Sequence, residues 1–476
     1  MPGLSCITEP APPAQESLEA WDREHVWHAF TQMAEYEPLL IERGEGVYLF
    51  DTAGTRYIDG SASMWCNVHG HRHPRLDAAL TRQLGLVAHT TNLGLSNPTT
   101  VELARRLVEI APAGLGKVFF SGDGSSATEA ALKIAFQYHR QTGTEQPRTR
   151  YIALGEAYHG DTLGAIGVGG VDRFTAMFAP LTFEAIRLPT PGLPAEATPT
   201  ADGGPRTDPS GQATTAAETL SRLEQLLTDQ GDSIAAVIME PLVQAAGGIL
   251  VHPRGFLQAV RELTRQAGVL LILDEIAVGF GRTGTMFACE QEDVSPDILC
   301  LGKGLTAGYL PMAATLTTAS IWQAFLGSHA DGRAFYHGHT FGGNPLAAAV
   351  ALESLAIFRD EAVLDRLPAL ICQLQTRLAE LAELPHVAGI RQCGLMAGLD
   401  LVADKQTGEP YPWEARTGAR ACLAARRHGA LLRQLGDTVV IMPPLSISPD
   451  ELDALVAAAA AGIEAVTQPP ESSRRG

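Results

Sequence analysis

Two charged residues stand at matching places in the sequence. Asp274 ends the apolar run VLLIL (269–273), and Lys303 follows the run DILCL (297–301) after a single glycine. Apolar runs of this length predict strands buried on both faces of a parallel sheet, and ligands bind outside the carboxyl ends of such strands. We therefore expect both side chains to point into one crevice.

An amine beside a carboxylate suits the chemistry of pyridoxal phosphate (PLP). The lysine amine binds the cofactor aldehyde covalently, and the carboxylate keeps the pyridine nitrogen protonated so that the ring can accept electrons. Taken singly, Asp274 also fits a strand-end carboxylate that caps a loop, and Lys303 also fits a solvated surface lysine. The pair is more informative than either residue, and it forms the core of the predicted catalytic set.

A predicted phosphate cradle precedes this pair in the chain. The segment SGDGSSATEAALK (121–133) follows the run KVFF and opens a predicted helix. The first N–H groups of a helix are unpaired and lie at the positive end of its dipole, so they bind phosphate readily. Taken alone, Gly122-x-Gly124-x-x-Ala127 also fits a dinucleotide-binding fingerprint, so a nicotinamide-dependent dehydrogenase is an alternative.

The motif YHGDT (158–162) follows the run RYIAL. At this place Tyr158 could stack on a flat ring, and we predict it as the third catalytic residue.

The run VLLILDE also resembles the Walker B strand of an ATPase. That class needs the motif GxxxxGK[ST], whereas Lys303 is followed by Gly304. The ATPase interpretation therefore lacks its phosphate loop.

Strand and helix patterns alternate between about residues 76 and 340. The predicted strands are 117–121, 150–154, 235–240, 269–275 and 297–302, with helices such as 127–140 and 255–267 between them. This alternation predicts an α/β large domain built on a mostly parallel, doubly wound sheet. The interruption at 189–217, rich in Pro, Gly, Thr and Ala, is expected to be a surface insertion.

The two ends of the chain predict a smaller α+β domain. A hairpin is expected over 46–60, and residues 21–75 are expected to pack with the domain formed by 341–476. In that C-terminal part, predicted helices (345–359, 365–384 and from 450) alternate with strand-like pieces (394–402 and 438–445). Residues 1–20, rich in Pro and Ala, are expected to be disordered.

The acidic balance of the chain argues against nucleic-acid and membrane partners. Of its 476 residues, 35 are Lys or Arg and 53 are Asp or Glu, so the net charge is −18, which disfavours binding to phosphate backbones or anionic lipids. No apolar run approaches the ~18 residues that span a bilayer, and the N-terminus lacks the pattern of a signal peptide. The seven cysteines are scattered without a CxxC pair, so no disulfide framework or metal site is expected. We expect a cytoplasmic location.

Four longer motifs resemble those of the class III, or ornithine-type, PLP-dependent aminotransferases. They are DEIAVGFGRTG (274–284), LGKGLTAGYLP (301–311), HGHTFGGNPLAAA (337–349) and MEPLVQAAGG (239–248). The Asp-to-Lys spacing, 303 − 274 = 29, is also that of the family. The resemblance covers about residues 21–468 and implies the type I fold of PLP-dependent transferases, PLP as cofactor and a homodimer with shared active sites.

Further segments resemble one branch of this family, the transaminases of biotin biosynthesis that convert 8-amino-7-oxononanoate to 7,8-diaminononanoate. They include VWHAFTQM (26–33), DGSASMWCNVHGHRHP (59–74), YHGDTLGA (158–165) and VIMPP (440–444). The implied reaction is ping-pong: the donor leaves its amino group on the cofactor, as pyridoxamine phosphate, and the acceptor then takes it. S-adenosylmethionine (SAM) is the implied donor. Lysine as donor, or another class III transaminase of ω-amines or ornithine, is the alternative.

The resemblance also implies roles for the matching residues. Lys303 would hold the cofactor and move the proton, while His339 and Thr340 would reach the phosphate from the neighbouring subunit. Arg391 would bind the carboxylate of 8-amino-7-oxononanoate through its planar fork. The implied cofactor-binding residues are Gly124, Ser125, Tyr158, Asp274, Lys303, His339 and Thr340, and the implied substrate-binding residues are Phe30, Met64, Trp65, Tyr158, Lys303, Gly338 and Arg391.

Four positions depart from the SAM-using form of this branch. That form has Trp where this chain has Met64, Tyr where it has Phe30 and Pro where it has His339. Met64, His339 and the run GYLP (308–311) look more like the branch that uses lysine, so the donor stays open between SAM and lysine. The family also has Ser at the position of Asp123, which here places an acid beside the expected phosphate.

Overall fold

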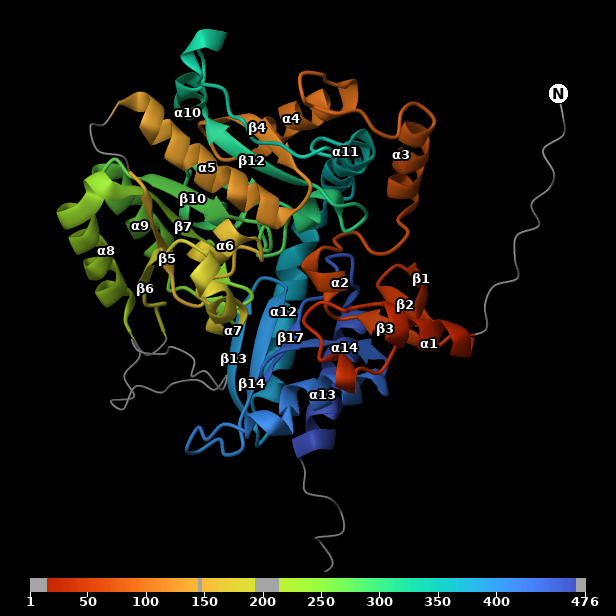
Figure 1. The fold of residues 1–476 in the computed structure, drawn as a ribbon. Coiled ribbons are helices and arrows are strands. Elements are labelled where there is room, and N and C mark those ends of the chain that lie inside the picture. Colours follow the sequence, from red (N-terminus) through yellow and green to blue (C-terminus); the bar gives the residue numbers. More distant parts are fainter. Residues whose placement is uncertain (1–14, 144–147, 193–213, 468–476) are drawn as a thin grey trace, which may run out of the picture.

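A seven-stranded sheet forms the centre of the molecule. The structure, a computed structural model, describes residues 15–143, 148–192 and 214–467. The strand order is β4-β12-β11-β10-β7-β5-β6, and all strands run parallel except β12 (Figure 1). The strands are β4 (Leu115–Ser121), β5 (Arg150–Leu154), β6 (Ile186–Leu188), β7 (Ile234–Met239), β10 (Leu270–Asp274), β11 (Ile298–Leu301) and β12 (Ala313–Thr318). The prediction of a mostly parallel sheet is confirmed.

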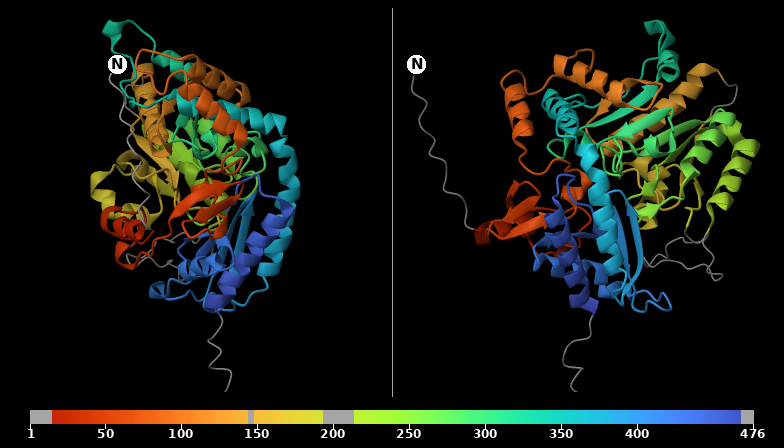
Figure 2. Two further views of the ribbon diagram at one scale, coloured as in Figure 1. Left: turned by 90° about the vertical axis from the view of Figure 1, so that its right-hand side faces the viewer. Right: turned by 180° about the vertical axis from the view of Figure 1, so that it is seen from behind.

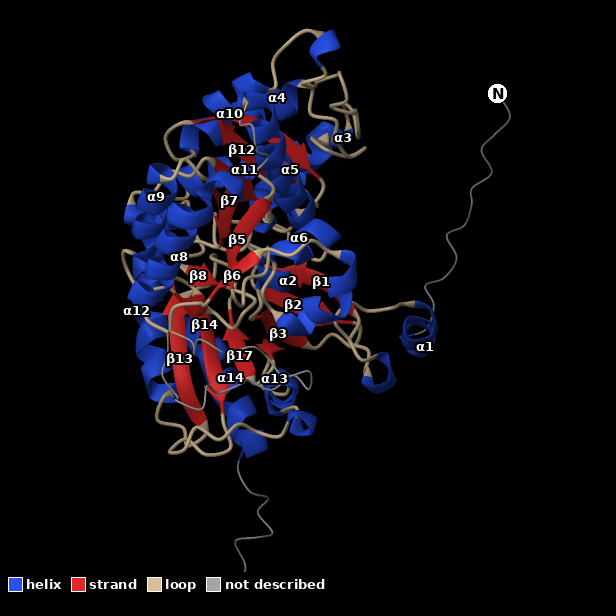
Figure 3. Ribbon diagram, turned by 60° about the vertical axis from the view of Figure 1, so that its left-hand side comes forward, coloured by secondary structure: helices blue, strands red, loops and turns tan. Residues whose placement is uncertain are grey.

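Alternate side chains of the central strands feed two separate cores. In β10, Leu271 and Leu273 belong to the core that contains α9, whereas Ile272 points into the core beneath α5. Because successive side chains of a strand point to opposite faces, a strand covered on both faces must be apolar throughout. Figure 3 shows helices on both sides of this sheet. They include α4 (Pro98–Ile110), α5 (Gly124–Thr142), α6 (Leu163–Val168), α8 (Ala216–Gln230), α9 (Phe256–Gln266) and α10 (Ala319–Ala324).

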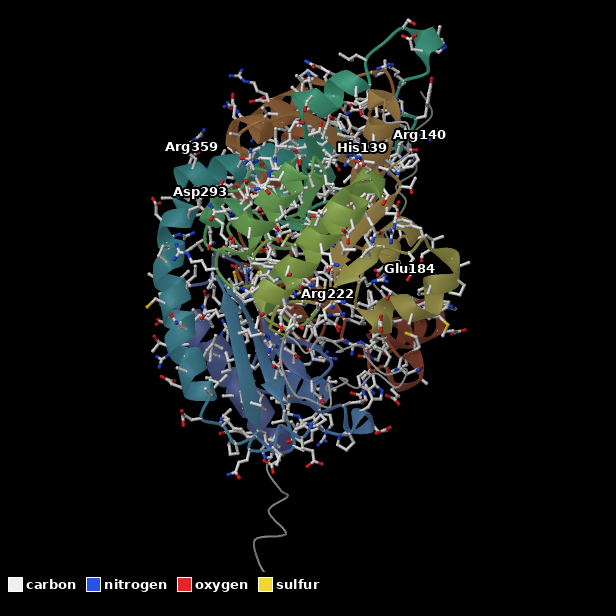
Figure 4. All side chains as sticks on the ribbon, turned by 90° about the vertical axis from the view of Figure 1, so that its left-hand side faces the viewer. His139, Arg140, Glu184, Arg222, Asp293 and Arg359 are labelled. Carbon is white, nitrogen blue, oxygen red and sulfur yellow. The ribbon has the colours of Figure 1, made fainter. Side chains whose placement is uncertain are left out.

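One buried histidine fixes α5 to the sheet. His139, labelled in Figure 4, lies in the last turn of α5, and its Nε2 lies 2.9 Å from the carbonyl oxygen of Ala235 in β7. Burial lowers the pKa of His139, so the ring stays neutral and donates to the carbonyl. The opposite end of α5, at Gly124, is thereby held at the carboxyl edge of the sheet.

The second domain joins both ends of the chain. Strand β3 (Arg56–Asp59) pairs in parallel with β15 (Ala430–Leu431), and the backbone N–H of Met442 donates to the carbonyl of Gly60 at 2.8 Å. The views of Figure 2 agree in placing the N-terminal strands beside the C-terminal helices. The predicted hairpin over 46–60 is confirmed as β2 and β3, and it packs with the C-terminal part of the chain as expected. The boundaries near 75 and 340 stay predictions.

This smaller domain contains two four-stranded sheets, in the orders β1-β2-β3-β15 and β13-β14-β17-β16. Its other strands are β1 (Ile41–Glu45), β2 (Tyr48–Asp51), β13 (Val387–Cys393), β14 (Met396–Leu401), β16 (Arg433–Leu435) and β17 (Thr438–Ile441). Its helices are α12 (Val363–Leu381), α13 (Thr417–Arg426) and α14 (Pro449–Thr467), while α3 (Pro74–Leu84) and α11 (Pro345–Asp360) pack on each other beside the large sheet. A minor ribbon pairs β8 (Val243–Gln244) with β9 (Leu250–Val251).

Two expectations need correction at their edges. The predicted disorder of residues 1–20 is wrong for 15–20, because helix α1 (Gln15–His25) includes them, and residues 1–14 lie outside the described part. Of the predicted insertion at 189–217, residues 193–213 also lie outside it. Its two ends meet, since the N–H of Gly192 donates to the carbonyl of Thr214 at 2.8 Å, and α8 already begins at Ala216.

A buried arginine ties three segments together. The guanidinium of Arg282 donates to the carbonyls of Pro443 at 2.6 Å, Leu395 at 3.4 Å and Asn67 at 3.4 Å. Only 3% of this residue is exposed, and burial lowers its pKa to about 10, which still leaves it charged at neutral pH. The loop after β10 is thus joined to both ends of the chain.

Within the described residues, no helix has the length and apolar character needed to cross a bilayer.

Candidate active site

The carboxyl ends of β10 and β11 open into a cavity of about 300 Å³. Asp274 is the last residue of β10 and pairs in register with Cys300 of the parallel strand β11, so Asp274 and Lys303 leave the sheet at the same edge. The cavity is lined by Trp65, Asp123, Gly124, Ser125, Tyr158, His159, Gly160, Glu240, Ala246, Asp274, Ile276, Ala277 and Lys303. Six of the predicted site residues are therefore brought together.

Lys303 holds its amine among opposite charges. It opens the short 3₁₀ turn η5 (Lys303–Thr306) with a left-handed φ of 42°, a conformation that a non-glycine residue keeps only where its surroundings hold it. Burial lowers the pKa of Lys303, while Asp274 and Glu240 oppose this effect. Its Nζ lies 5.3 Å from the centre of the Trp65 ring. A lysine with a lowered pKa is a better nucleophile and proton carrier near neutral pH.

The Asp274 carboxylate is fixed on two sides. Its Oδ2 lies 2.8 Å from Nδ1 of His159, and its Oδ1 accepts a hydrogen bond from the N–H of Ile276 at 3.0 Å. Both side chains are buried. A carboxylate held this way in the interior can meet a protonated ring nitrogen without first reorganising.

The phosphate end of the cavity is the first turn of α5, and the structure explains the acid in front of it. Asp123 is the N-cap: its Oδ1 accepts from the N–H of Ser126 at 2.9 Å and its Oδ2 accepts from Oγ of Ser126 at 2.9 Å. The N–H groups of Gly124 and Ser125 have no partner within the helix and remain for an anion. Asp123 nevertheless sets a carboxylate beside this cradle.

A glycine lets the Tyr158 loop approach the cradle. A Cβ at Gly160, whose φ is 122°, would lie 2.1 Å from Oγ of Ser125. No side chain fits there, and the N–H of Asp161 donates to that Oγ at 3.2 Å. This close approach closes the cavity between the loop and α5.

Tyr158 and Glu240 form the side wall. The Glu240 carboxylate accepts from the N–H of Tyr158 at 3.2 Å and from the N–H of Ala245 at 2.9 Å. Burial raises the pKa of Glu240 to about 7, and burial together with the Asp161 carboxylate raises that of Tyr158. The Tyr158 hydroxyl, which donates to Asp161 at 2.8 Å, therefore stays protonated and presents its ring to the cavity.

Trp65 reaches the cavity from an unusual turn, in which Met64 directly precedes it. The segment α2 (Ala62–Trp65) is left-handed, with φ values of 46°, 47°, 71° and 71° at its four residues. Left-handed backbone costs roughly 1–2 kcal/mol for each non-glycine residue. Trp65 is buried and lines the cavity, whereas Met64 is 40% exposed beside it.

Phe30 is linked to the cavity through a row of aromatic rings. Its ring meets that of Phe174 edge-on at 5.3 Å, and Phe174 meets Tyr158 edge-on at 5.9 Å. Phe30 is 55% exposed and has a left-handed φ of 53°. The row leads from solvent to Tyr158, so Phe30 lies at the outer end of the site rather than in its lining.

The residues Gly338, His339 and Thr340 do not line this cavity. They lie in the loop before α11, where a Cβ at Gly338 would be 3.2 Å from Leu93. Nε2 of His339 is buried and has no hydrogen-bond partner among the described residues. This placement is compatible with a role at a neighbouring subunit's site, which stays a prediction.

The expected role of Arg391 does not fit its geometry. Arg391 lies in β13, and its guanidinium forms an ion pair through both terminal nitrogens with Asp400 of β14. The carbonyls of Gly248 and Ile249 accept from its Nε at 3.0 and 3.2 Å, and Nη2 also donates to Gly248 at 2.8 Å. A guanidinium whose Nε and both terminal nitrogens are already engaged has no free pair of donors for a substrate carboxylate, so its geometry favours a structural role.

Arg433, which the sequence interpretation missed, is the better candidate. It lies in β16, its Nε is buried, and that Nε has no hydrogen-bond partner in the part of the chain that the structure describes. Burial lowers the pKa of Arg433, and Tyr158 and Arg173 are near enough to influence it electrostatically. The signal in the sequence was a single arginine in the otherwise uncharged run 429–436.

The residues present fit PLP. Two buried polar atoms in the lining, Nε2 of His159 and Nε1 of Trp65, lack a hydrogen-bond partner among the described residues, as expected of a cavity that receives a polar ligand. Lys303, Asp274 and the first turn of α5 offer an amine, a carboxylate and an anion site around the cavity.

A larger groove of about 810 Å³ between α3, α4 and α11 contains none of the predicted site residues. In the described residues, no group of three or more His, Cys, Asp or Glu side chains could hold a metal.

Comparison with known proteins defines the class. Residues 31–461 match the class III aminotransferase family, to which the chain therefore belongs. It is a PLP-dependent aminotransferase of fold type I. The resemblance in the motifs is thereby confirmed, and the dehydrogenase alternative is wrong.

Particular relatives narrow the class further. The chain is 51% identical to an adenosylmethionine-8-amino-7-oxononanoate aminotransferase from Nitratidesulfovibrio vulgaris, over 95% of this chain and 82% of that protein. It is 50% identical to the protein of that name from Aquifex aeolicus, over 93% and 96% of the two chains. The crystal structure of the Methanocaldococcus jannaschii protein of the same name superimposes with a TM-score of 0.88 at 39% identity, covering 95% of this chain and 99% of that one.

The cap at Asp123 generates the first prediction. Asn caps helices about as well as Asp, so Asp123→Asn is expected to keep the melting temperature of the cofactor-free protein while removing a negative charge from the phosphate cradle. The dissociation constant for PLP should fall severalfold, as for a favourable change of about 1 kcal/mol. Titration of the cofactor-free protein with PLP, followed by absorbance, measures it. Asp123→Ala is the control, since it also loses the cap and should melt at a lower temperature. Weaker PLP binding by the Asn variant would contradict this role of the charge.

Proposed function

We propose that this aminotransferase transfers an amino group from SAM to 8-amino-7-oxononanoate and so forms 7,8-diaminononanoate in biotin biosynthesis. The names of the most similar relatives support this choice of substrates. In the structure, the observation that carries the proposal is Arg433, a half-buried arginine near Tyr158 whose buried Nε has no hydrogen-bond partner among the described residues. An acceptor with a remote carboxylate supplies the partner that this cation lacks.

Lys303 is the proposed proton carrier. When bound, PLP supplies an electron sink that allows a bond at the amine-bearing carbon to be broken heterolytically. Lys303 Nζ would accept the proton from this carbon and then donate it to the cofactor, a role that its lowered pKa favours. Asp274 would stabilise a positive charge at the ring nitrogen, and His159 fixes the orientation of that carboxylate.

Two features exclude water and fix the ring. Tyr158 and Trp65 border the cavity on the substrate side, and the first turn of α5 holds the phosphate at the other end. Gly124 and Ser125 are the proposed phosphate ligands, through their N–H groups. These residues would hold the cofactor at its phosphate and at its ring nitrogen, with the Lys303 amine between them.

The aromatic rings near the site favour SAM as the amino donor. SAM carries a flat adenine and a sulfonium cation, both of which bind aromatic faces. Trp65, Phe30 and Phe174 offer such faces, which favours SAM. Lysine is the second candidate. Met64, which directly precedes the cavity-lining Trp65, is unbranched, adaptable and 40% exposed, and an aliphatic donor needs less aromatic surface.

A homodimer is proposed from one apolar surface. Large apolar side chains are exposed on two neighbouring loops, with exposed fractions of 67% at Leu93 and 62% at Phe341. The loops are joined, since the ring of His89 lies 4.6 Å from that of Phe341. Exposed apolar patches of this kind mark protein interfaces. The exposed apolar side chains on and next to these loops are Leu84, Leu86, Leu93, Leu95, Tyr336 and Phe341. Leu93 lies against Gly338, next to His339 and Thr340, which would then reach the phosphate in the partner's site.

The reaction is tested with single half-reactions. The PLP-loaded enzyme is mixed with SAM or with lysine, and the loss of the cofactor's visible absorbance is followed. We expect conversion with SAM, none with Lys303→Ala, and release of 7,8-diaminononanoate when 8-amino-7-oxononanoate is added. Conversion by lysine alone would replace the donor. In that event Met64→Trp reports whether position 64 contributes to donor choice. Failure of the acceptor to regain the absorbance would refute the biotin-pathway assignment.

The two arginines separate the carboxylate-binding role from a structural one. Arg433→Ala is expected to raise the KM for 8-amino-7-oxononanoate by about tenfold or more, because a charge-assisted hydrogen bond contributes roughly 1.5–3 kcal/mol. The donor half-reaction should change little. Arg391→Ala removes the ion pair of Asp400 and leaves that half-buried carboxylate with the Thr438 hydroxyl as its donor, at 2.7 Å. This variant is expected instead to lower the melting temperature without a preference for either half-reaction. The reverse pattern would return the role to Arg391.

Shared active sites predict complementation between inactive variants. Thr340→Glu would set a carboxylate against the partner's phosphate, and Lys303→Ala removes the proton carrier. After subunit exchange, heterodimers carry one site with both defects and one intact site, so about a quarter of wild-type activity is expected for random pairing. Lys303→Ala mixed with Asp274→Ala is the control and should recover nothing, since both residues come from the same chain. Equal recovery in both mixtures, or in neither, would rule out the shared site.

A further inference from the structure

The left-handed turn Ala62–Trp65 is held by one buried carboxylate. Asp59 ends β3 and is 1% exposed. Its Oδ1 accepts from the N–H of Ser63 at 3.0 Å, and its Oδ2 accepts from the Ser63 hydroxyl at 2.7 Å. Burial alone would raise the pKa of Asp59, but the His71 and Ser63 donors hold it below its usual value. The carboxylate is therefore charged at neutral pH and binds the middle of the turn from two directions.

His71 anchors the other side of this carboxylate. Its Nε2 lies 3.0 Å from Oδ2 of Asp59, and its Nδ1 lies 3.1 Å from Nδ2 of Asn67. Because Oδ1 of Asn67 accepts from the N–H of Gly70 at 2.8 Å, its amide nitrogen faces the ring. Nδ1 of His71 is then an acceptor, and Nε2 carries the hydrogen that it donates to Asp59.

The anchor is itself fixed to the N-terminal sheet. Gly46, which follows β1, exchanges two backbone hydrogen bonds with His71, at 2.6 and 3.1 Å. Gly44 lies so close that a Cβ there would be 2.8 Å from the Cβ of His71. The chain of contacts thus runs from β1 through His71 and Asp59 to Ser63, and it ends at the turn that carries Met64 and Trp65.

The turn needs such a support. Four successive non-glycine residues with left-handed φ persist only where the surroundings over-determine them. The turn's own backbone bonds, such as Trp65 N–H to the Ser61 carbonyl at 2.8 Å, fix its ends. Asp59 acts on Ser63, directly before Met64 and Trp65, of which Trp65 lines the cavity.

We propose that Asp59 is a positioning residue for substrate recognition: by holding Ser63, it sets the left-handed turn that presents Met64 and Trp65 to the amino donor. This inference rests on the proposed function only for the identity of the donor. Asp59 touches neither the cavity nor Lys303 directly, so its effect falls on donor binding rather than on proton transfer.

Asp59→Asn tests the proposal. The amide retains one acceptor but loses the charge, so the KM for the donor should rise by about tenfold or more, as for one lost charge-assisted hydrogen bond, with kcat changed far less. In the cofactor-free protein, amide hydrogen exchange over residues 61–66 should accelerate, while exchange over β10 and β11 stays slow. Adding Ser63→Gly should restore the donor KM, because glycine adopts left-handed φ without strain.

Asp51→Asn is the matched control. Asp51 lies in the same sheet, is 8% exposed, and accepts from the N–H groups of Ala53 and Thr55 and from the Tyr57 hydroxyl. Its replacement should lower stability without changing the donor KM or exchange over 61–66. If Asp59→Asn does not fold, Ser63→Ala removes only the hydroxyl contact and should raise the donor KM by a smaller factor.

The outcomes are separable. A donor KM and an exchange rate over 61–66 that stay at wild-type values in Asp59→Asn would overturn the proposal. So would a loss that Ser63→Gly does not reverse, since that pattern belongs to a purely structural carboxylate. If neither SAM nor lysine reacts with the wild-type enzyme, the proposed function fails, but the exchange measurement on the cofactor-free protein still decides the role of Asp59.

Discussion

The structure around the site depends on one constraint: the buried amine of Lys303 must be able to carry a proton. Burial disfavours the ammonium of Lys303, and Asp274 and Glu240 offset this by their negative charge. Buried charges of this kind are tolerated only when each finds partners. Asp274 is held by His159, and Glu240 is held by two backbone N–H groups. Asp274 and Glu240 therefore line the cavity and also stabilise the charged form of the Lys303 amine.

The topology of the large sheet brings the partners of Lys303 to one edge. Parallel pairing of β10 with β11 sets Asp274 and the segment before Lys303 at one edge, and α5 begins at the same edge. Arg282 then joins the loop after β10 to carbonyls from both ends of the chain. The smaller domain is not an independent addition, since its N-terminal part supplies Trp65 to the lining.

The parts that the sequence predicted are those set by local pattern. Continuous apolar runs identify β5, β7, β10 and β11 to within about one or two residues, and Asp274 and Lys303 follow from where these runs end. Strand β12 was missed because AATLTT is small and threonine-rich rather than apolar, although it is buried between two neighbours. The role of Arg391 could not be judged from sequence, because only the register of β13 with β14 brings its partner Asp400 within reach. In that register Asp400 pairs with Gly389, two residues before Arg391. The capping role of Asp123 likewise depends on a turn geometry that a lone acidic residue does not disclose.

The left-handed turn also limits how the substrate site can change over evolutionary time. At positive φ, a β-branched side chain clashes with its own backbone, so valine, isoleucine and threonine are disfavoured at positions 62–65. The residues open to position 64 are then glycine, asparagine and unbranched or aromatic side chains, which differ in length and flatness rather than in branching. A change of amine preference through position 64 is therefore expected to come from a longer side chain, an aromatic one or glycine. The left-handed backbone disfavours the branched alternatives.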